Sequence, residues 1–419
     1  MCKHNLHRLK RLRISFNGMY GEIPSSLEQC SQLEYVSLRS NSFTGNVPTQ
    51  IGKLTMLQEL YLGANYLSGN IPKEIANLTR LQWLGLHNNN LSGNIPKEIG
   101  NLRMLQWLNL NTNKLSDSIP KEICALTNLQ TLDVSANNFT GHVPREIGNL
   151  TMLQLLDLST NELSGNIPVE IGALTNLQYL DMSFNNFSDH VPREIGNAKR
   201  LQSLYLSNNK LSGNIPKAIG ALTNLQNLDV SVNNLSGNVP KEIGNLKMLK
   251  WLNVRTNKLS GNIPKDIGRL TILQTLSMNF NNLSGQVPRE IWNLTMLQAL
   301  YLGNNMLSGN IPIEIGALTD LQYLDMSFNN FSDHVPREVG NLTSLQSLYL
   351  NNNKLSGKIP KDIGALTNLQ NLAMNFNNFS GQVPREIWNL TMLHSLYLGN
   401  NNLSGNIPKE IDALTNLQI

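Results

Sequence analysis

The residues best suited to chemistry in this chain are carboxylates and aromatic rings that recur at a fixed spacing. Asp133, Asp157 and Asp181 lie 24 residues apart. Carboxylates held side by side repel one another, so a cation or a basic ligand group would relieve them. An open row of aspartates has no pocket to perturb its pKa values, and a purely structural use is the alternative. The row therefore predicts no catalysis and, at Asp181, a position for ligand contact.

Motifs of catalysis and metal binding do not occur in the sequence. There is no Gly-rich phosphate loop, no GxSxG and no HExxH. None of the 7 histidines joins a cysteine or a second histidine in a CxxC or HxxxH metal-ligand pattern. The net charge of +4 is too small to argue for nucleic acid. We therefore expect no enzyme, no cofactor, no metal and no nucleic-acid partner.

Large aromatic residues recur at two fixed offsets, six and four residues before a repeating asparagine. Exposed aromatic rings gathered on one face are typical of interface anchors. The alternative is cross-strand pairing that only stabilises a sheet. With Asp181 and the basic Arg255, the candidate ligand-binding residues are Tyr61, Trp83, Trp107, Tyr179, Asp181, Tyr205, Trp251, Arg255, Tyr301, Tyr323 and Tyr349.

One strict period positions all of these residues. The 17 prolines stand at every 24th position from Pro24 to Pro408. An asparagine series runs beside them without a gap, from Asn17 to Asn401. A period of this length is the mark of a solenoid, in which stacked repeats bury a face that no single repeat can bury alone.

The elements of one repeat can be predicted from residues 57–81. Glu59-Leu60-Tyr61-Leu62 alternates, so it suits a short strand with its leucines inward and Tyr61 outward. Gly69 permits a tight bend, and Pro72 fixes φ where a new direction begins. Ile75 and Leu78 are three apart, which suits a 3₁₀ turn facing the same core.

Stacking about 17 such repeats predicts an α/β solenoid. Its parallel β-sheet would line the concave face, and its short 3₁₀ or helical turns would line the convex face. The asparagine series would form a ladder that satisfies backbone groups at the strand ends. The unbroken period favours a single domain, 1–419. Because polar caps are not visible at either end, we expect an interior segment of a longer receptor.

The three cysteines, Cys2, Cys30 and Cys124, do not fix the redox compartment. Cys30 falls in a leucine register, which favours a buried free thiol. Cys124 lies about four repeats further on, roughly 19 Å along the stack and too far for a disulfide to Cys30.

The repeat LQELYLGANYLSGNIPKEIANLTR resembles the plant-specific leucine-rich repeat, whose mark is the LSGxIP stretch, and the resemblance covers the whole chain. It implies the ectodomain of a plant receptor-like kinase or receptor-like protein in signalling or defence. Such ectodomains bind a peptide or protein ligand on the concave sheet, with a similar leucine-rich-repeat co-receptor as a further partner. Alternatives within the family are a soluble inhibitor of cell-wall-degrading enzymes, similar to polygalacturonase inhibitors, and an ice-binding protein.

The resemblance also implies the extracellular side of the plasma membrane. The chain itself has no apolar run of 18 residues that would span a membrane and no apolar segment of a signal peptide. N-x-S/T sequons are frequent and predict a glycoprotein, although NLT and NLS are also part of the repeat consensus. The predicted glycosylation sites are Asn77, Asn90, Asn138, Asn149, Asn186, Asn234, Asn282, Asn293, Asn330, Asn341, Asn378, Asn389 and Asn402.

Groups of repeats recur almost unchanged. Residues 177–197 reappear at 321–341, six repeats later, with a single substitution. Copying extends the scaffold and repeats its surface, so it weakens any argument for one unique site.

Overall fold

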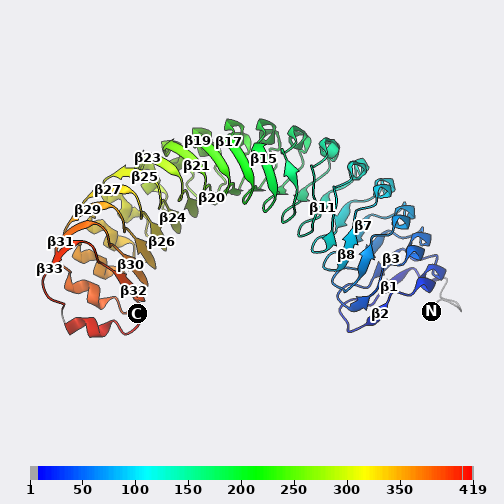
Figure 1. Ribbon diagram of the computed structural model, residues 1–419, viewed down its shortest axis with the longest axis horizontal. Helices are drawn as coiled ribbons and strands as arrows, with labels where there is room; N and C mark the ends of the chain where they lie inside the picture. The colour runs from blue at the N-terminus through cyan, green and yellow to red at the C-terminus, as the bar shows by residue number, and fades with distance from the viewer. Residues whose placement is uncertain (1–7, 408, 418–419) are drawn as a thin grey trace. The chain divides into compact units, whose positions relative to one another are not determined.

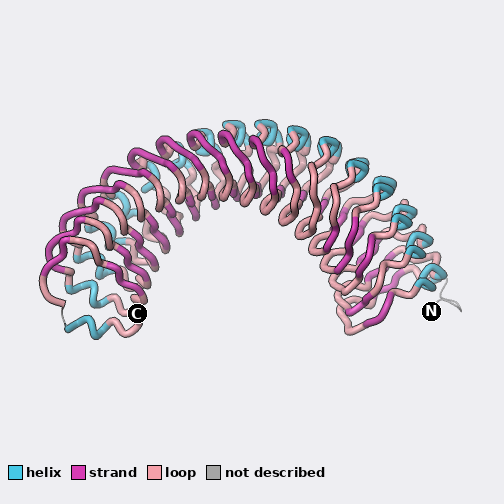
Figure 2. Tube along the Cα trace, viewed as in Figure 1, coloured by secondary structure: helices cyan, strands magenta, loops and turns pink. Residues whose placement is uncertain are grey.

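Two compact units, Met1–Leu211 and Ser212–Ile419, make up the computed structural model, which describes residues 8–407 and 409–417. In each unit every 24-residue repeat makes one turn of a coil (Figure 1). The turn consists of an inner strand, in most repeats a second strand, and a 3₁₀ turn, as Figure 2 shows by colour. This confirms the predicted leucine-rich-repeat solenoid.

The inner strands are each three residues long and pair in parallel with their neighbours, one repeat apart, so that Tyr35 lies opposite Glu59. In the first unit they are β1 (Arg11–Arg13), β3 (Tyr35–Ser37), β5 (Glu59–Tyr61), β7 (Trp83–Gly85), β9 (Trp107–Asn109), β11 (Thr131–Asp133), β12 (Leu155–Asp157), β14 (Tyr179–Asp181) and β16 (Ser203–Tyr205). In the second unit they are β18 (Asn227–Asp229), β20 (Trp251–Asn253), β22 (Thr275–Ser277), β24 (Ala299–Tyr301), β26 (Tyr323–Asp325), β28 (Ser347–Tyr349), β30 (Asn371–Ala373) and β32 (Ser395–Tyr397).

A second row of short parallel strands was not predicted from the sequence. It follows the ladder asparagines, and its LSGN segments pair from repeat to repeat where a glycine such as Gly69 adopts a φ of +71°. These strands are β2 (Tyr20–Glu22), β4 (Ser42–Thr44), β6 (Ser68–Asn70), β8 (Asn90–Gly93), β10 (Lys114–Leu115), β13 (Ser164–Gly165), β15 (Asn186–His190), β17 (Lys210–Asn214), β19 (Asn234–Asn238), β21 (Lys258–Asn262), β23 (Asn282–Gln286), β25 (Met306–Gly309), β27 (Asn330–Asp333), β29 (Lys354–Gly357), β31 (Asn378–Gln382) and β33 (Asn402–Ser404).

The 3₁₀ turns begin directly after the repeating prolines. Pro72, with φ −68°, is extended and ends the preceding segment before the turn at Lys73. The turns are η2 (Ser25–Gln29), η3 (Thr49–Lys53), η4 (Lys73–Asn77), η5 (Lys97–Asn101), η6 (Lys121–Ala125), η7 (Arg145–Asn149), η8 (Val169–Ala173), η9 (Arg193–Asn197), η10 (Lys217–Ala221), η11 (Lys241–Asn245), η12 (Lys265–Arg269), η13 (Arg289–Asn293), η14 (Ile313–Ala317), η15 (Arg337–Asn341), η16 (Lys361–Ala365), η17 (Arg385–Asn389) and η18 (Lys409–Ala413).

The asparagine ladder joins each repeat to the one before it and the one after it. The Asn65 Nδ2 donates to the carbonyl oxygens of Leu62 (3.0 Å) and Leu38 (3.1 Å). Its Oδ1 accepts from the Phe43 N–H at 3.0 Å. The side-chain amide therefore satisfies strand-end carbonyls and one N–H group that the backbone hydrogen bonds of the two sheets leave unpaired, as predicted from the sequence.

The residue before each ladder asparagine adopts a left-handed backbone conformation, with φ between 50° and 59° from Phe16 to Asn400. Side chains other than Gly and Asn adopt this conformation at a cost in free energy. The repeat imposes it on Val232 and on several phenylalanines as well. The coil geometry therefore overrides the local preference of these residues.

The prediction of a free thiol at Cys30 is wrong, because Cys30 is disulfide-bonded. The spacing argument excluded only Cys124 as a partner, and Cys2 lies outside the described residues. Cys124 is a buried free cysteine, and burial raises its pKa to about 12. No helix in residues 8–407 and 409–417 is long and apolar enough to cross a bilayer.

Candidate functional site

The first unit presents a cluster of aromatic rings on the outward face of its inner sheet. The ring of Tyr61 on β5 contacts Tyr35 on β3, with centroids 5.9 Å apart, and Trp107 on β9, at 6.1 Å. The Trp107 ring also meets His87 edge-on at 6.4 Å. We name Tyr35, Tyr61, His87 and Trp107 the N-terminal aromatic cluster.

Two glycines make room for this cluster. A Cβ at Gly85 would lie 3.0 Å from the Trp107 ring and 3.3 Å from the Tyr61 ring. A Cβ at Gly63 would lie 2.5 Å from the ring of His87. Trp83 and Trp107 are directly paired in register, but the Trp107 ring leans over Gly85 toward Tyr61, two strands away. The cluster therefore depends on residues that carry no side chain.

Burial dominates the electrostatics of the cluster. His87 is 8% exposed, and its Nδ1 has no hydrogen-bond partner. Burial lowers the pKa of His87, and the charge of Arg39 lowers it further. Burial and a hydrogen bond from the Tyr61 hydroxyl to the Glu59 carboxylate (3.0 Å) raise the pKa of Tyr61. The rings thus form a neutral, half-buried surface that can contact an apolar ligand group.

The aspartate row lies further along the same sheet, where β11, β12 and β14 bring Asp133, Asp157 and Asp181 side by side. Each carboxylate accepts hydrogen bonds from the hydroxyl and N–H of the serine two residues later. For Asp181 these bonds measure 2.6 and 2.8 Å, and the Tyr179 hydroxyl donates to its other oxygen at 3.2 Å. These hydrogen bonds give the aspartates a structural use within the sheet, and contact of Asp181 with a ligand stays a prediction.

Asp157 is the most perturbed member of this row. Burial raises its pKa to about 6, opposed by the hydrogen bonds from Ser159 and reinforced by the charges of Asp133 and Asp181. Tyr179 beside it contacts Tyr205 with ring centroids 5.7 Å apart. This part of the face combines partial negative charge with two tyrosine rings.

The second unit carries the remaining candidates on its own inner sheet. Tyr301 and Tyr323 stack with centroids 6.5 Å apart and an interplanar angle of 27°. Trp251 and Tyr349 are half-buried, and Arg255 is exposed. The candidates thus do not gather at one point but follow the sheet strand by strand, and their role in binding stays a prediction.

Five phenylalanines lie at the rim of the inner sheet. Phe16, Phe184, Phe280, Phe328 and Phe376 are each about half exposed or more, at the left-handed position where the inner strand ends, so they lie at the rim. At the start of the first unit, the Arg11 guanidinium lies 4.5 Å from the centre of the Tyr35 ring.

The predicted glycosylation sites lie outside the inner strands. Most of their asparagines are exposed, and two, Asn186 and Asn330, are half-buried. The inner sheet would therefore remain uncovered if these sites carried glycans.

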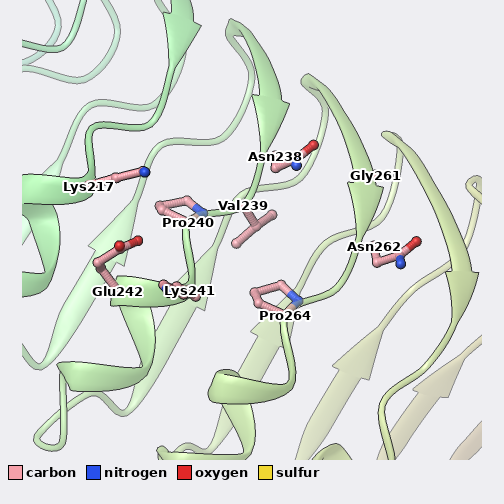
Figure 3. Close-up of a pocket in the computed structure, with 9 residues that line it drawn as sticks. All are labelled: Lys217, Asn238, Val239, Pro240, Lys241, Glu242, Gly261, Asn262 and Pro264. Atoms are coloured by element: carbon pink, nitrogen blue, oxygen red, sulfur yellow. The ribbon is translucent and has the colours of Figure 1, made fainter.

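Hollows also occur between the second-row strands and the 3₁₀ turns. Figure 3 shows one of about 480 Å³, where Asn238 and Asn262 stand at the ends of β19 and β21 above Pro240 and Pro264. Equivalent hollows recur at Asn214 and at Asn70, so they are a product of the repeat geometry rather than a unique site. Among the described residues, no three His, Cys, Asp or Glu side chains are grouped so as to hold a metal ion.

Comparison with known proteins identifies the family. A family model described as a leucine-rich repeat region matches residues 63–190, 135–241, 168–283, 233–354 and 310–419, and another, described as a leucine rich repeat, matches residues 31–91. No curated protein sequence matches the chain significantly.

Several solved structures share the architecture. The TDR receptor is 33% identical, with a TM-score of 0.94 over 98% of this chain and 71% of that one. The Arabidopsis receptor kinase HAESA, solved with the peptide hormone IDA and the co-receptor SERK1, is 32% identical, with a TM-score of 0.85 over 98% and 73%. A leucine-rich-repeat protein of Leptospira interrogans is 36% identical, with a TM-score of 0.74 over 97% and 99%. The chain therefore belongs to the leucine-rich-repeat family, a family of recognition scaffolds, and it resembles the ectodomains of plant receptor kinases.

Proposed function

We propose that this chain is the ligand-binding region of a plant-type receptor and that it binds an extended peptide on its inner sheet. The observation that carries the proposal is the N-terminal aromatic cluster, in which Tyr61 and Trp107 are packed together before any ligand arrives. Rings held in this way lose little conformational freedom on binding and supply large contact areas. They are therefore suited to anchor a ligand side chain.

The similar receptors support the choice of ligand. HAESA is described with a peptide hormone and a co-receptor, and its ectodomain aligns with 98% of this chain. By extension, a peptide is the first ligand to consider here, with a leucine-rich-repeat co-receptor as a further partner. Ligand binding would then lead to signalling and not to catalysis.

Two features support an extracellular setting. Cys30 is disulfide-bonded, and disulfides persist in oxidising compartments. The sequons lie mostly on exposed asparagines outside the inner strands.

The 24-residue period runs without a break through both compact units, which supports one continuous domain.

A displayed library of random dodecapeptides, selected on the immobilised chain, would provide ligands for a test. For a selected synthetic peptide we expect Trp107→Ala and Tyr61→Ala each to raise the dissociation constant by roughly 30-fold, the effect of losing a binding hot spot. Calorimetry measures the change, and circular dichroism should remain that of the parent chain.

Tyr66→Ala is the matched control, since Tyr66 is 60% exposed and lies just after the ladder asparagine, outside the inner strand. This variant should bind as tightly as the parent. If the selected peptides bind equally to all three variants, the N-terminal aromatic cluster is not their anchor and the observation that carries the proposal fails.

A further inference from the structure

In the second unit, three neighbouring strands bring a glycine between two polar side chains. The Phe280 N–H donates to the Gly303 carbonyl (3.0 Å), and the Asn304 N–H donates to the Ser327 carbonyl (2.9 Å). These bonds place Asn279, Gly303 and Ser327 side by side on successive repeats. Asp325 lies on the outward face two residues before Ser327. We name Asn279, Gly303 and Asp325 the Gly303 notch.

The Asp325 carboxylate occupies the space that a side chain at position 303 would fill. A Cβ at Gly303 would lie 2.5 Å from its Oδ2 and 2.7 Å from its Oδ1. The Oδ1 accepts hydrogen bonds from the Ser327 hydroxyl (2.6 Å) and N–H (2.9 Å). Burial raises the pKa of Asp325, opposed by these two bonds. Ser327 thus holds Oδ1, Oδ2 accepts no hydrogen bond from the described residues, and both carboxylate oxygens lie over Gly303.

Asn279 supplies a second oxygen that lacks a partner. Its side chain is 8% exposed, and its Oδ1 is buried with no hydrogen-bond partner. A buried carbonyl oxygen without a donor loses its hydration and gains nothing in return, so such atoms are rare, and a bound donor is one way to satisfy them. A ligand that donates hydrogen bonds to both Asn279 and Asp325 would remove this defect.

The surroundings favour an organic cation over a metal ion. Stacked Tyr301 and Tyr323 adjoin the notch, and Phe280 and Phe328, 52% and 48% exposed, lie at the rim of its strands. Aromatic faces attract guanidinium and ammonium groups. One carboxylate and one amide oxygen are far fewer than the six to eight oxygen ligands that Ca²⁺ takes.

We propose that the Gly303 notch binds an arginine side chain of the peptide ligand. A guanidinium carries five N–H donors in a planar fork, enough to reach both oxygens while its plane lies against a tyrosine ring. The inference rests on the proposed function, and it adds that the ligand carries a basic residue at the notch.

A near-copy of the same residues shows what the notch requires. Residues 177–197 repeat 321–341, so Asp181 corresponds to Asp325 and Tyr179 to Tyr323. The strand before Asp181, however, carries Ser159 where the strand before Asp325 carries Gly303. The second oxygen of Asp181 accepts from the Tyr179 hydroxyl at 3.2 Å, whereas the Tyr323 hydroxyl donates to Gln346. The strand that precedes the copied block, rather than the block itself, creates the notch.

Arg255 lies beside Asn279, at the same position of the preceding repeat. The Thr256 N–H donates to the Asn279 carbonyl (2.9 Å) and fixes this register. The Arg255 side chain is exposed. A cation in the notch would meet weak repulsion from it across solvent, so we expect Arg255→Ala to strengthen binding about twofold.

The probe is the tripeptide acetyl-Gly-Arg-Gly-amide, compared with versions that carry citrulline, lysine or norleucine in place of arginine. Citrulline keeps the shape of arginine and removes its charge. Saturation-transfer NMR on the full chain should show the arginine peptide binding at least about fivefold more tightly than the citrulline peptide. Asp325→Asn should weaken the arginine peptide by roughly tenfold, the effect of losing a charged hydrogen bond.

Gly303→Ala should weaken it to a similar extent, because the added Cβ displaces the carboxylate. Asp181→Asn, the matched substitution in the copied block, should leave binding unchanged. Equal binding of the arginine and citrulline peptides would overturn the proposal, as would arginine selectivity that survives Asp325→Asn and Gly303→Ala. Tighter binding of Ca²⁺ than of the arginine peptide at this site would overturn it as well.

These outcomes are separate from those for the proposed function. Selected dodecapeptides that depend on Trp107 but do not distinguish arginine from citrulline would remove the notch and leave peptide binding intact. Arginine selectivity that depends on Asp325, with dodecapeptides insensitive to the aromatic variants, would remove the N-terminal aromatic cluster as an anchor and leave the notch intact.

Discussion

At the scale of single residues, a recurring arrangement is a large or charged side chain that lies over a glycine of the preceding strand. His87 lies over Gly63, Trp107 over Gly85 and Asp325 over Gly303. In each case the glycine has no side chain, and the side chain from the following repeat occupies the space above it. The chemistry of the inner face is therefore set by pairs of residues on adjacent strands.

Asp157 gives a prediction about pH. Its pKa in the folded chain, about 6, is raised above the ordinary 3.8 by burial. The folded state therefore holds this proton more tightly than the unfolded state, and stability falls as pH rises from about 4 to about 6. Replacing Asp157 with the neutral Asn should raise the free energy of unfolding at pH 7 by about 1–3 kcal/mol, with little change at pH 4.

Urea denaturation of the parent and Asp157→Asn chains at the two pH values measures this difference. A stabilisation of the same size at pH 4 and pH 7 would contradict the ionic explanation, because it would then have to come from packing alone.

At the scale of elements, the ladder asparagines offer the sharpest test of how the coil holds together. The Asn137 Nδ2 donates to the Leu110 (3.0 Å) and Val134 (3.2 Å) carbonyls, and its Oδ1 accepts from the Leu115 N–H at 3.0 Å. Asn137→Ala leaves these buried groups unpaired and should lower the free energy of unfolding by about 2–4 kcal/mol.

The adjacent exposed Asn138 provides the control, and Asn138→Ala should change stability by less than about 0.5 kcal/mol. Both variants can be compared by their urea midpoints. Equal midpoints would mean that the ladder is not a source of stability.

Much of this element structure was predictable from the sequence. Leu60 and Tyr61 alternate as a strand requires, Pro72 precedes a 3₁₀ turn, and Asn65 bonds as a ladder residue. The second row of strands was not predicted, because its LSGN segments form a sheet only through neighbouring repeats. The aromatic residues could be placed on the outward face from the sequence. The leaning of Trp107 over Gly85 could not be predicted, because it depends on which side chains lie opposite each other on adjacent strands.

At the scale of the whole molecule, the sequons predict glycans on the surface outside the inner sheet, which would stay uncovered. When the chain is secreted from plant cells, we expect glycans on the exposed Asn138 and Asn234 at higher occupancy than on the half-buried Asn186 and Asn330, because the transferred sugar needs an accessible amide. Enzymatic glycan release in ¹⁸O-labelled water converts each glycosylated asparagine to an ¹⁸O-labelled aspartate, and peptide mass spectrometry then measures occupancy site by site.

Non-sequon asparagines such as the exposed Asn101 serve as the internal reference and should carry no label beyond spontaneous deamidation. Unmodified sequons throughout a secreted chain would argue against the glycoprotein interpretation, and the NLT and NLS segments would then be repeat consensus alone.

The copied blocks have a consequence for how such a chain changes over generations. Because the period is a constant 24 residues, recombination between misaligned repeats inserts or deletes whole turns of the coil and leaves a chain that still folds. New residue combinations arise only at the junction, and the strand carrying Gly303 directly precedes a block almost identical to 177–197. A single genetic event can thus create a recognition site that would otherwise need several point mutations, and it does so without putting the scaffold at risk.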